Sequence, residues 1–168
     1  MTTIRSAACL AIEMKSEYEI VSLTEAHLAD VAELERLCFA EPWSENSLRL
    51  LCEEGGFGAV AVSEGRVIAY AGMTTVLDEG AITNIATHPS ARRQGFGRAV
   101  TEALLTYARA HGIRSVFLEV RESNEAARRL YESLGFLPCG IRKNFYRHPT
   151  ESAVLMVWTD ETEEETKA

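Results

Sequence analysis

The sequence predicts a single α/β (α+β) domain, with about seven strands and about four helices in the order β-α-α-β-β-β-α-β-α-β-β. Three observations support this prediction. Stretches rich in β-branched and apolar residues alternate with segments whose apolar residues recur at helical spacing. Helix-capping residues and glycines stand at the boundaries between them. The chain of 168 residues can bury one sizeable core, and no internal repeat or interdomain linker divides it.

The first third of the chain predicts one strand followed by two helices. Residues 18–23 alternate well enough for a strand. Thr24 can cap a helix, and its apolar face would hold Leu28, Val31, Leu34 and Leu37. Pro42 interrupts that helix, Ser44 can cap a second one, and Gly55 ends it.

Three strands follow in the middle of the sequence. Residues 57–63 and 66–76 predict a hairpin around the tight turn Glu64-Gly65. A further turn at residues 78–80 leads into a strand over residues 82–87, which His88-Pro89 ends because proline has no amide hydrogen to donate.

The last part of the chain predicts two helices and three strands. The first helix runs to about His111, with Gly112 after it, and a strongly apolar strand covers residues 116–121. Ser123 or Asn124 can cap the last helix, which ends at Gly135. The two final strands are expected at residues 136–145 and 153–159, joined through His148-Pro149.

A basic, glycine-containing turn stands between the strand at residues 82–87 and the long helix. Its residues are Arg92, Arg93, Gln94, Gly95, Phe96, Gly97 and Arg98. The turn lies at a helix N-terminus, where backbone N–H groups lack intrahelical partners and the helix dipole favours an anion. The glycines allow a ligand to approach the backbone closely. The spacing matches neither the dinucleotide nor the P-loop motif, so we interpret the turn as another kind of phosphate site.

The charge distribution restricts the partners. The formal net charge is −8, and residues 160–168 contribute −4 through five acids and one lysine. This acidic tail is expected to be solvated and disordered. The remaining −4 argues against a nucleic-acid surface and suits a basic protein or amine substrate.

Neither a metal site nor a membrane span is expected. The four histidines form no metal-binding pair or cluster. Reduced, mostly buried thiols are expected at the widely spaced Cys9, Cys38, Cys52 and Cys139. Glu13 and Lys15 interrupt the apolar run at residues 7–12 before a convincing signal peptide is formed. The expected compartment is the cytoplasm.

Two motifs resemble a known family. The pattern from Arg92 to Gly97 is similar to the coenzyme A loop of the GCN5-related N-acetyltransferases, and the segment Leu130–Phe136 resembles their L-Y-x-x-x-G-F signature. The resemblance covers residues 18–159, and it leaves residues 1–17 as a leader. It implies a mixed central sheet of about seven strands, flanked by about four helices, in which the fourth and fifth strands splay apart.

Within this superfamily, several segments resemble RimI-type ribosomal-protein alanine N-acetyltransferases. The segments are Pro42–Glu45, Asn84–Ala86, Leu118–Arg121, Ser123–Asn124 and Ile141–Tyr146. The chain departs from the family pattern at His88, where an acid usually precedes the proline, and at Phe145, which stands in place of a tyrosine. Its leader is also longer than the family minimum.

The resemblance implies acetyl-coenzyme A as cosubstrate, bound between the splayed strands. The backbone of Ile85, Ala86 and Thr87 would pair with the pantetheine arm like an added strand. The amides of the turn at residues 92–98 would take the pyrophosphate. Asn124 would be a further cofactor contact, and Trp43 and Tyr146 are weaker candidates for substrate binding.

Glu119 and Tyr131 are the candidate catalytic pair. On a half-buried strand Glu119 shares a face with Phe117, which would ordinarily make it a surface residue. Beside the acetyl donor, however, it can serve as general base for an α-amine whose pKa is near 8. Tyr131 could simply pack in the core. The resemblance places it beside the sulfur, where a phenol can protonate the departing thiolate.

The expected activity is acetyl transfer to the N-terminal α-amine of a protein that begins with alanine, most specifically ribosomal small-subunit protein eighteen. Two alternatives stay open. One is a lysine, small-amine or polyamine acetyltransferase on the same fold, and the other is a catalytically silent acyl-coenzyme A-binding module. The expected partner is a basic protein N-terminus, without nucleic acid or membrane, and the enzyme is expected to be a monomer or weak dimer.

Overall fold

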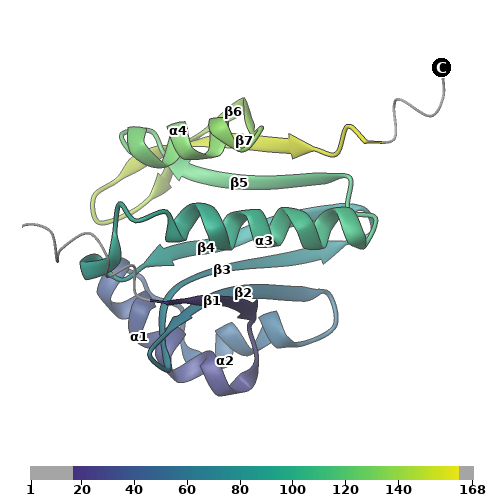
Figure 1. Ribbon diagram of the computed structural model, residues 1–168. Helices are drawn as coiled ribbons and strands as arrows, with labels where there is room; N and C mark the ends of the chain where they lie inside the picture. The colour runs from purple at the N-terminus through teal and green to yellow at the C-terminus, as the bar shows by residue number, and fades with distance from the viewer. Residues whose placement is uncertain (1–16, 163–168) are drawn as a thin grey trace, which may run out of the picture.

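The computed structural model describes residues 17–162, so the predictions for the leader and for most of the acidic tail lie outside the described residues. Seven strands form one sheet in the order β1-β2-β3-β4-β5-β7-β6 (Figure 1). Their bounds are β1 Glu19–Ser22, β2 Gly56–Ser63, β3 Arg66–Val76, β4 Glu79–Thr87, β5 Ser115–Arg121, β6 Leu137–Tyr146 and β7 Glu151–Thr159. Every neighbouring pair is antiparallel except β4–β5, which is parallel. The predicted mixed sheet is confirmed.

Four α-helices accompany the sheet. They are α1 Leu28–Cys38, α2 Glu45–Leu48, α3 Phe96–Ala110 and α4 Glu125–Ser133. Short 3-10 turns precede α1 at Glu25–His27, continue α2 at Arg49–Cys52 and follow β4 at Pro89–Ala91. One apolar cluster joins α1 and α2 to the sheet, and a second joins α3 and α4 to it.

Ser44 and Asn124 cap α2 and α4 as predicted, whereas Thr24 precedes the 3-10 turn Glu25–His27 and α1 itself begins at Leu28. The Ser44 hydroxyl accepts a hydrogen bond from the Ser47 amide at 3.1 Å. Of the two candidates for α4, Asn124 is the cap, because its Oδ1 accepts from the Ala127 amide at 3.2 Å. These side chains satisfy amides that have no partner within the first helical turn. The sequence rules for helix starts therefore hold for α2 and α4.

Three expectations are corrected by the structure. The turn before β4 lies at Leu77-Asp78, and Leu77 adopts a φ of +55°, so the strand begins at Glu79 instead of Ile82. Leu37 is 51 % exposed rather than part of the buried face of α1, and Glu35 is buried in that face instead. The cysteines were expected to be mostly buried, but among the described residues Cys38 and Cys52 are only half-buried and Cys139 is exposed, so this prediction is wrong for all three.

The feature that shapes the site is the separation of β4 from β5. Their pairing covers only Glu79↔Ser115, Gly80↔Val116 and Ala81↔Phe117, and within the described residues it extends no further. From Ile82 onward β4 follows β3 while β5 follows β7. The sheet therefore opens along the second halves of these two central strands (Figure 1).

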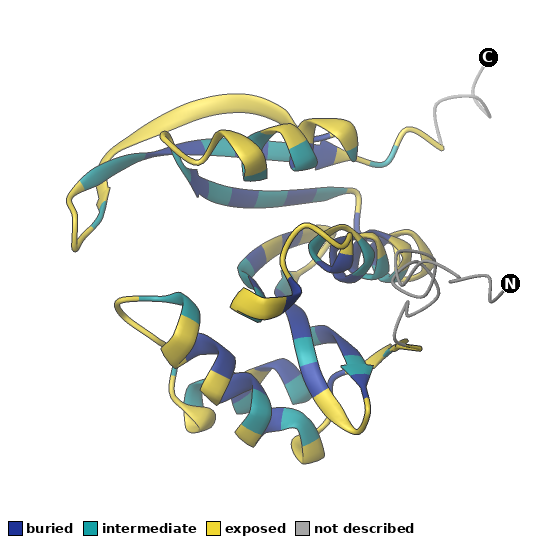
Figure 2. Ribbon diagram, turned by 60° about the vertical axis from the view of Figure 1, so that its left-hand side comes forward, coloured by how far each residue is buried: buried dark blue, intermediate teal, exposed yellow. Residues whose placement is uncertain are grey.

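The side chains of β5 alternate strictly between two environments. Val116, Leu118 and Val120 are buried, and Phe117 and Glu119 are intermediate. Figure 2 shows this alternation along the strand beside the opening. The period of two predicted it, since successive strand residues point to opposite faces of a sheet.

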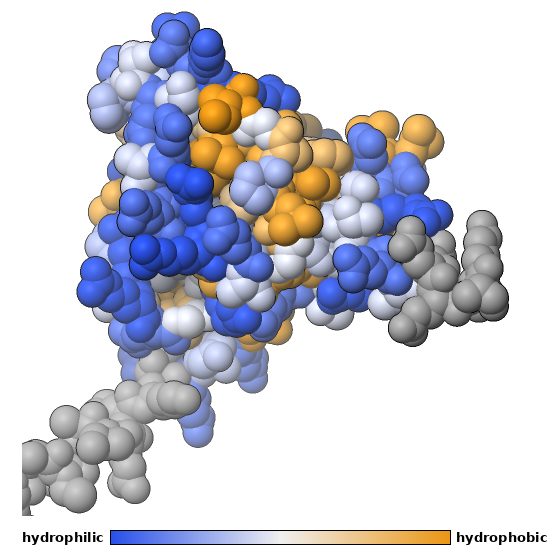
Figure 3. Space-filling model, turned by 90° about the horizontal axis from the view of Figure 1, so that it is seen from above, coloured by the Kyte–Doolittle hydropathy of each residue, from blue (hydrophilic) through white to orange (hydrophobic). Residues whose placement is uncertain are grey.

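The far edge of the sheet is formed by β6, most of which is exposed. Its exposed large apolar side chains are Leu137, Ile141 and Phe145. Figure 3, which looks down on the end of the molecule that carries α4, β6 and β7, shows apolar side chains gathered in the middle of this face. Among residues 17–162, no helix is long and apolar enough to cross a bilayer.

Candidate active site

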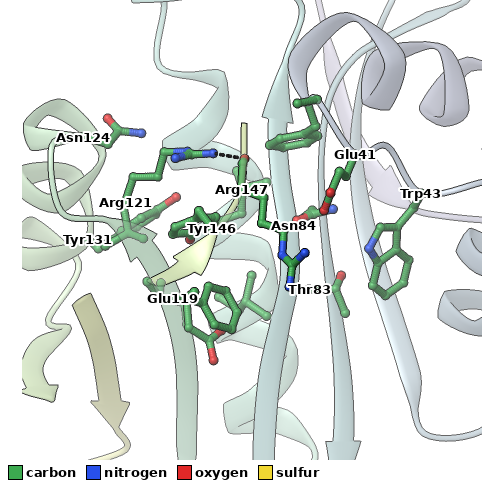
Figure 4. Close-up of a pocket in the computed structure, with 17 residues that line it drawn as sticks. Glu41, Trp43, Thr83, Asn84, Glu119, Arg121, Asn124, Tyr131, Tyr146 and Arg147 are labelled. Atoms are coloured by element: carbon green, nitrogen blue, oxygen red, sulfur yellow. Dashed lines mark hydrogen bonds between the residues drawn. The ribbon is translucent and has the colours of Figure 1, made fainter. Parts of the chain in front are cut away.

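A pocket of about 500 Å³ lies where β4 and β5 separate. Its walls come from these two strands, the loop between α1 and α2, the start of α4 and the segment that ends β6. The lining includes six residues singled out from the sequence, namely Trp43, Ile85, Glu119, Asn124, Tyr131 and Tyr146. Figure 4 shows Trp43, Thr83 and Asn84 on the β4 side and Glu119 and Tyr131 on the β5 side. The structure thus brings both predicted catalytic residues to one cavity.

Glu119 projects from β5 with a side chain that is 25 % exposed. Glu119 is one of the half-buried residues that alternate with buried ones along the strand, and it lines the pocket. Its Oε1 lies 3.6 Å from Nε of Arg142, which belongs to β6. A partly accessible carboxylate in a cavity can accept a proton from a bound amine directly or through one water.

Tyr131 lies on α4 and is both a core residue and a pocket residue. It is 9 % exposed, and its ring meets Phe136 edge to face at 5.9 Å between centroids. Burial, with a smaller effect of Tyr146, raises the pKa of its hydroxyl to about 12. The group therefore stays protonated at neutral pH and remains available as a donor. The packing and catalytic interpretations are compatible here.

Arg121 organises the β6–β7 side of the pocket. Its guanidinium donates to the carbonyls of Arg147 at 3.1 Å (dashed line in Figure 4) and of Pro149 at 3.0 Å. It also pairs with Glu151 at 3.2 Å and lies 4.5 Å above the ring of Tyr146. Hydrogen bonding from Ser123, followed by Arg121, lowers the pKa of the Glu151 carboxyl. The positive charge of Arg121 is thus engaged in holding this wall in place.

Tyr146 lines the pocket from that wall, together with the candidate catalytic residues Glu119 and Tyr131. Burial is the main cause that raises the pKa of its hydroxyl to about 12, and the charge of Glu119 adds to it. The neighbouring Phe145 stacks edge to face on Tyr146 at 5.0 Å and is 44 % exposed. Both aromatic residues line the pocket, so the phenylalanine keeps the apolar surface of the family pair without its hydroxyl.

The predicted phosphate turn lies next to the opening, outside the residues that line the pocket. Gly95 precedes α3 with a φ of +86°, and no side chain caps this helix start. A Cβ added to Gly97 would lie 3.7 Å from both the Thr87 hydroxyl and the Leu130 side chain. The turn is therefore seated between the end of β4 and α4, with helix amides unpaired by any side-chain cap. This geometry fits a pyrophosphate.

The free edge of β4 fits the rest of an acyl-coenzyme A molecule. On one edge, residues 85–87 pair with Ala69–Ala71 of β3. On the other edge no strand of residues 17–162 pairs with them, since β5 has already diverged. An extended amide-containing arm can add to such an edge through main-chain hydrogen bonds. Ala86 is buried, so its contribution would come from the backbone.

The side chains of the turn have separate roles in the structure. Arg98 donates to the Ser133 hydroxyl at 2.7 Å and pairs with Glu102 at 3.2 Å, which ties the start of α3 to α4. The Arg92 guanidinium lies 3.8 Å from Sγ of Cys38. Phe96 is buried and packs edge to face on Tyr18 at 4.8 Å. Arg93 adopts a φ of +63° within the turn.

Several pocket residues were not predicted from the sequence, among them Glu41, Thr83, Arg121 and Arg147. Thr83 and Asn84 reach the pocket because β4 carries a bulge, where pairing with β3 passes from Ala71↔Ile85 to Met73↔Ile82. An extra residue in one strand re-aims the side chains beside it. The alternation of residues along β4 does not indicate this extra residue. The Thr83 hydroxyl is buried without a hydrogen-bond partner among the described residues.

Valine at Gly95 and Gly97 should raise the acetyl-coenzyme A KM at least tenfold. Branched side chains there would strain the left-handed Gly95 and block the approach of phosphate to the amides. Steady-state kinetics at saturating acceptor measure the change. Gly112→Val, at the other end of the same helix, is the matched control because Gly112 has a φ of +71° and open space around it. A change below twofold in the folded double variant would show that the turn does not bind the pyrophosphate.

A parallel strand pair that opens beside an uncapped helix start, with a carboxylate and a phenol in the opening, defines a class of enzyme. It is the class of acetyl-coenzyme A-dependent N-acetyltransferases. The chain belongs to the acetyltransferase (GNAT) family, whose model matches residues 28–136. Enzymes of this family use acetyl-coenzyme A, and the chain is an N-acetyltransferase.

Two curated relatives are similar over most of the chain. The [ribosomal protein bS18]-alanine N-acetyltransferase of Escherichia coli K12 is 39% identical over 141 residues, covering 82% of this chain and 94% of the relative. The putative enzyme of the same description from Bacillus subtilis is 32% identical over 145 residues, covering 85% and 96%. The chain is thus RimI-like.

Solved structures agree with this assignment. The crystal structure of the E. coli ribosomal-protein-S18-alanine N-acetyltransferase matches with a TM-score of 0.80 at 36% identity, covering 85% of this chain and 94% of that one. Ard1 from Thermoplasma volcanium matches with a TM-score of 0.75 at 24% identity, covering 84% and 97%, which supports the fold alone.

Proposed function

We propose that this enzyme acetylates the N-terminal α-amine of a protein that begins with alanine, and that the protein is ribosomal protein bS18. The observation that carries the proposal is the joint presence of Glu119 and Tyr131 in the opening between β4 and β5. The names of the similar enzymes support the identity of the acceptor. An acceptor of this kind places the enzyme in the cytoplasm with the ribosomal proteins.

The two residues divide the proton transfers between them. Glu119 takes a proton from the α-ammonium of the acceptor, directly or through one water, so that the amine nitrogen can form its bond to the acetyl carbon. As the bond between that carbon and sulfur breaks, Tyr131 gives its phenolic proton to the leaving thiolate. A backbone N–H of β4 would hold the acyl oxygen while negative charge develops on it. The nitrogen joined to the acetyl carbon still carries one excess proton, which returns to the Tyr131 phenolate, directly or through water, and leaves the neutral amide. Glu119 releases the proton it took to solvent, so that both residues are ready for the next turnover.

The charges of the enzyme favour a cationic acceptor. Outside the acidic tail the chain carries a net charge of −4, obtained by subtracting the −4 of residues 160–168 from −8. The pocket lining itself carries two acids, Glu41 and Glu119, and two arginines, Arg121 and Arg147, so the acidic excess lies outside the pocket. A basic peptide is steered towards such a surface, and the steering fades as salt screens charges beyond about 8–10 Å.

The test compares two peptides of one basic sequence. The first has a free N-terminal alanine, and the second is pre-acetylated but carries an internal lysine. At pH 7 about a tenth of an α-amine of pKa near 8 is neutral, against less than about one part in a thousand for lysine near 10.4. We expect the first peptide to be acetylated at least a hundredfold faster, as measured by mass spectrometry. Equal rates would favour a lysine or small-amine acetyltransferase, and cofactor binding without turnover would favour a silent binding module.

A further inference from the structure

Glu35 is a buried carboxylate to which the proposed mechanism gives no role. It lies on α1 and is 0 % exposed. Its Oε2 accepts the backbone N–H of Trp43 at 3.0 Å, and its Oε1 accepts the side-chain amide of Asn84 at 3.0 Å and the hydroxyl of Tyr70. All three partners donate, which suits a carboxylate because it only accepts.

Stability alone does not account for this arrangement. Removing a carboxylate from water is costly, and its hydrogen bonds at best offset that cost. An apolar side chain of similar volume often serves a core at least as well. What distinguishes Glu35 is the position of its partners, because Trp43 and Asn84 both line the pocket. Its contacts therefore join α1, the α1–α2 loop, β3 and β4 at one wall of the site.

The charge of Glu35 sets the orientation of the Asn84 amide. An asparagine side chain has a donor end and an acceptor end, and the carboxylate can take only the donor end. With Nδ2 directed to Glu35, Oδ1 is turned away from it. Tyr70 also donates to Glu35 and stays a donor, because burial and then the Glu35 carboxylate raise the pKa of the Tyr70 hydroxyl and keep it protonated. The bulge of β4 brings this fixed amide to the pocket, on the side facing Glu119.

We propose that Glu35 is a positioning residue for the acceptor. Its carboxylate holds the Asn84 amide so that the amide oxygen is available to the incoming amine, and it also holds the Trp43 segment at the pocket wall. The inference rests on the proposed amine acetylation. An oxygen placed before binding can accept an N–H of the amine without first being reordered. Glu35 itself does not touch either substrate.

Glu35→Gln is the discriminating variant, since it preserves shape and replaces one acceptor by a donor. Three donors surround the side chain, so the new amide group must oppose at least one of them or force Asn84 to flip. We expect the KM for an alanine-starting peptide to rise at least tenfold, with the acetyl-coenzyme A KM within twofold of the parent value. An unchanged peptide KM in the folded variant, or equal rises of both KM values, would overturn the proposal.

Tyr70→Phe is the matched control. It removes one hydrogen bond of the same carboxylate and leaves both pocket partners in place. Tyr70 itself does not line the pocket. The peptide KM should stay within threefold of the parent value. If the peptide KM of Tyr70→Phe rises as much as that of Glu35→Gln, then loss of any hydrogen bond to this carboxylate raises the KM. That result would refute the positioning role of Glu35.

A measurement without substrate separates this inference from the proposed function. Hydrogen exchange of the Trp43 amide should be at least tenfold faster in Glu35→Gln than in the parent or in Tyr70→Phe. If the parent acetylates no peptide, the proposed function fails while exchange still reports whether Glu35 holds the loop. Should Glu35→Gln not fold, Asn84→Ala provides the second test. Its peptide KM should rise at least tenfold, and an unchanged value would overturn the proposal.

Discussion

Replacing Tyr131 by phenylalanine should lower kcat by about 10²- to 10³-fold while the domain stays folded, because general acid catalysis contributes about this much. The substitution removes only the hydroxyl and keeps the ring against Phe136. The measurement is kcat at saturating peptide and acetyl-coenzyme A, with the thermal midpoint as a check on folding.

Tyr107→Phe serves as the control for loss of a phenolic oxygen elsewhere. Tyr107 lies on α3, stacks on Phe57 and His111, and is not part of the pocket lining. It should leave kcat within twofold of the parent value. If Tyr131→Phe is unstable but fully active per folded molecule, Tyr131 is a packing residue and the proposed acid is wrong.

The pH dependence of kcat at alkaline pH should follow the protonation of Tyr131. Tyr131 is protonated below its pKa of about 12. The donor is therefore present from neutral pH to about pH 10 and is lost only as the pH rises through the folded-state value. An alkaline decline of kcat with a midpoint near 9 would show that another group supplies the proton.

Glu119→Gln should cut kcat/KM by about 10²-fold at neutral pH, because the variant can no longer remove a proton from the bound ammonium. The loss should shrink as the pH rises, since solvent then deprotonates an α-amine whose pKa is near 8. The comparison to make is the pH profile of kcat/KM for the variant and the parent.

Glu122→Gln is the control for removal of one negative charge from this region. Glu122 is exposed, lies three residues further along the chain and is not part of the pocket lining. Its kcat/KM should stay within twofold of the parent value at every pH. A folded Glu119→Gln that retains more than half of the parent activity at neutral pH would contradict the proposed base.

Local rules predicted the parts of the fold that depend on neighbouring residues. Asn124 caps α4 and Ser44 caps α2 because a short polar side chain before a helical apolar pattern reaches the free amides behind it. The alternation along β5 placed Glu119 on the accessible face for a similar reason. The gathering of both candidate catalytic residues in one pocket was implied by the family resemblance.

What the sequence did not predict depends on contacts between distant segments. Glu35 stands among other charged residues of α1, where a solvent-facing position is the ordinary expectation. Its burial became understandable only once Tyr70 and Asn84, 35 and 49 positions away, were seen to donate to it. Likewise, a bulge is a mismatch between two strands, and one strand read alone does not reveal it.

Because β4 and β5 pair over so short a length, the stability of the folded enzyme should depend on the concentration of acetyl-coenzyme A. On the proposed position of acetyl-coenzyme A, the cosubstrate completes the hydrogen bonding of an otherwise open sheet. A ligand present at one hundred times its Kd stabilises the folded state by about 2.7 kcal/mol. A domain commonly has only about 5–15 kcal/mol of net stability in all. When acetyl-coenzyme A is scarce, two effects would therefore lower the total activity. Fewer enzyme molecules would hold the cosubstrate, and the less stable free enzyme would be lost to proteolysis faster.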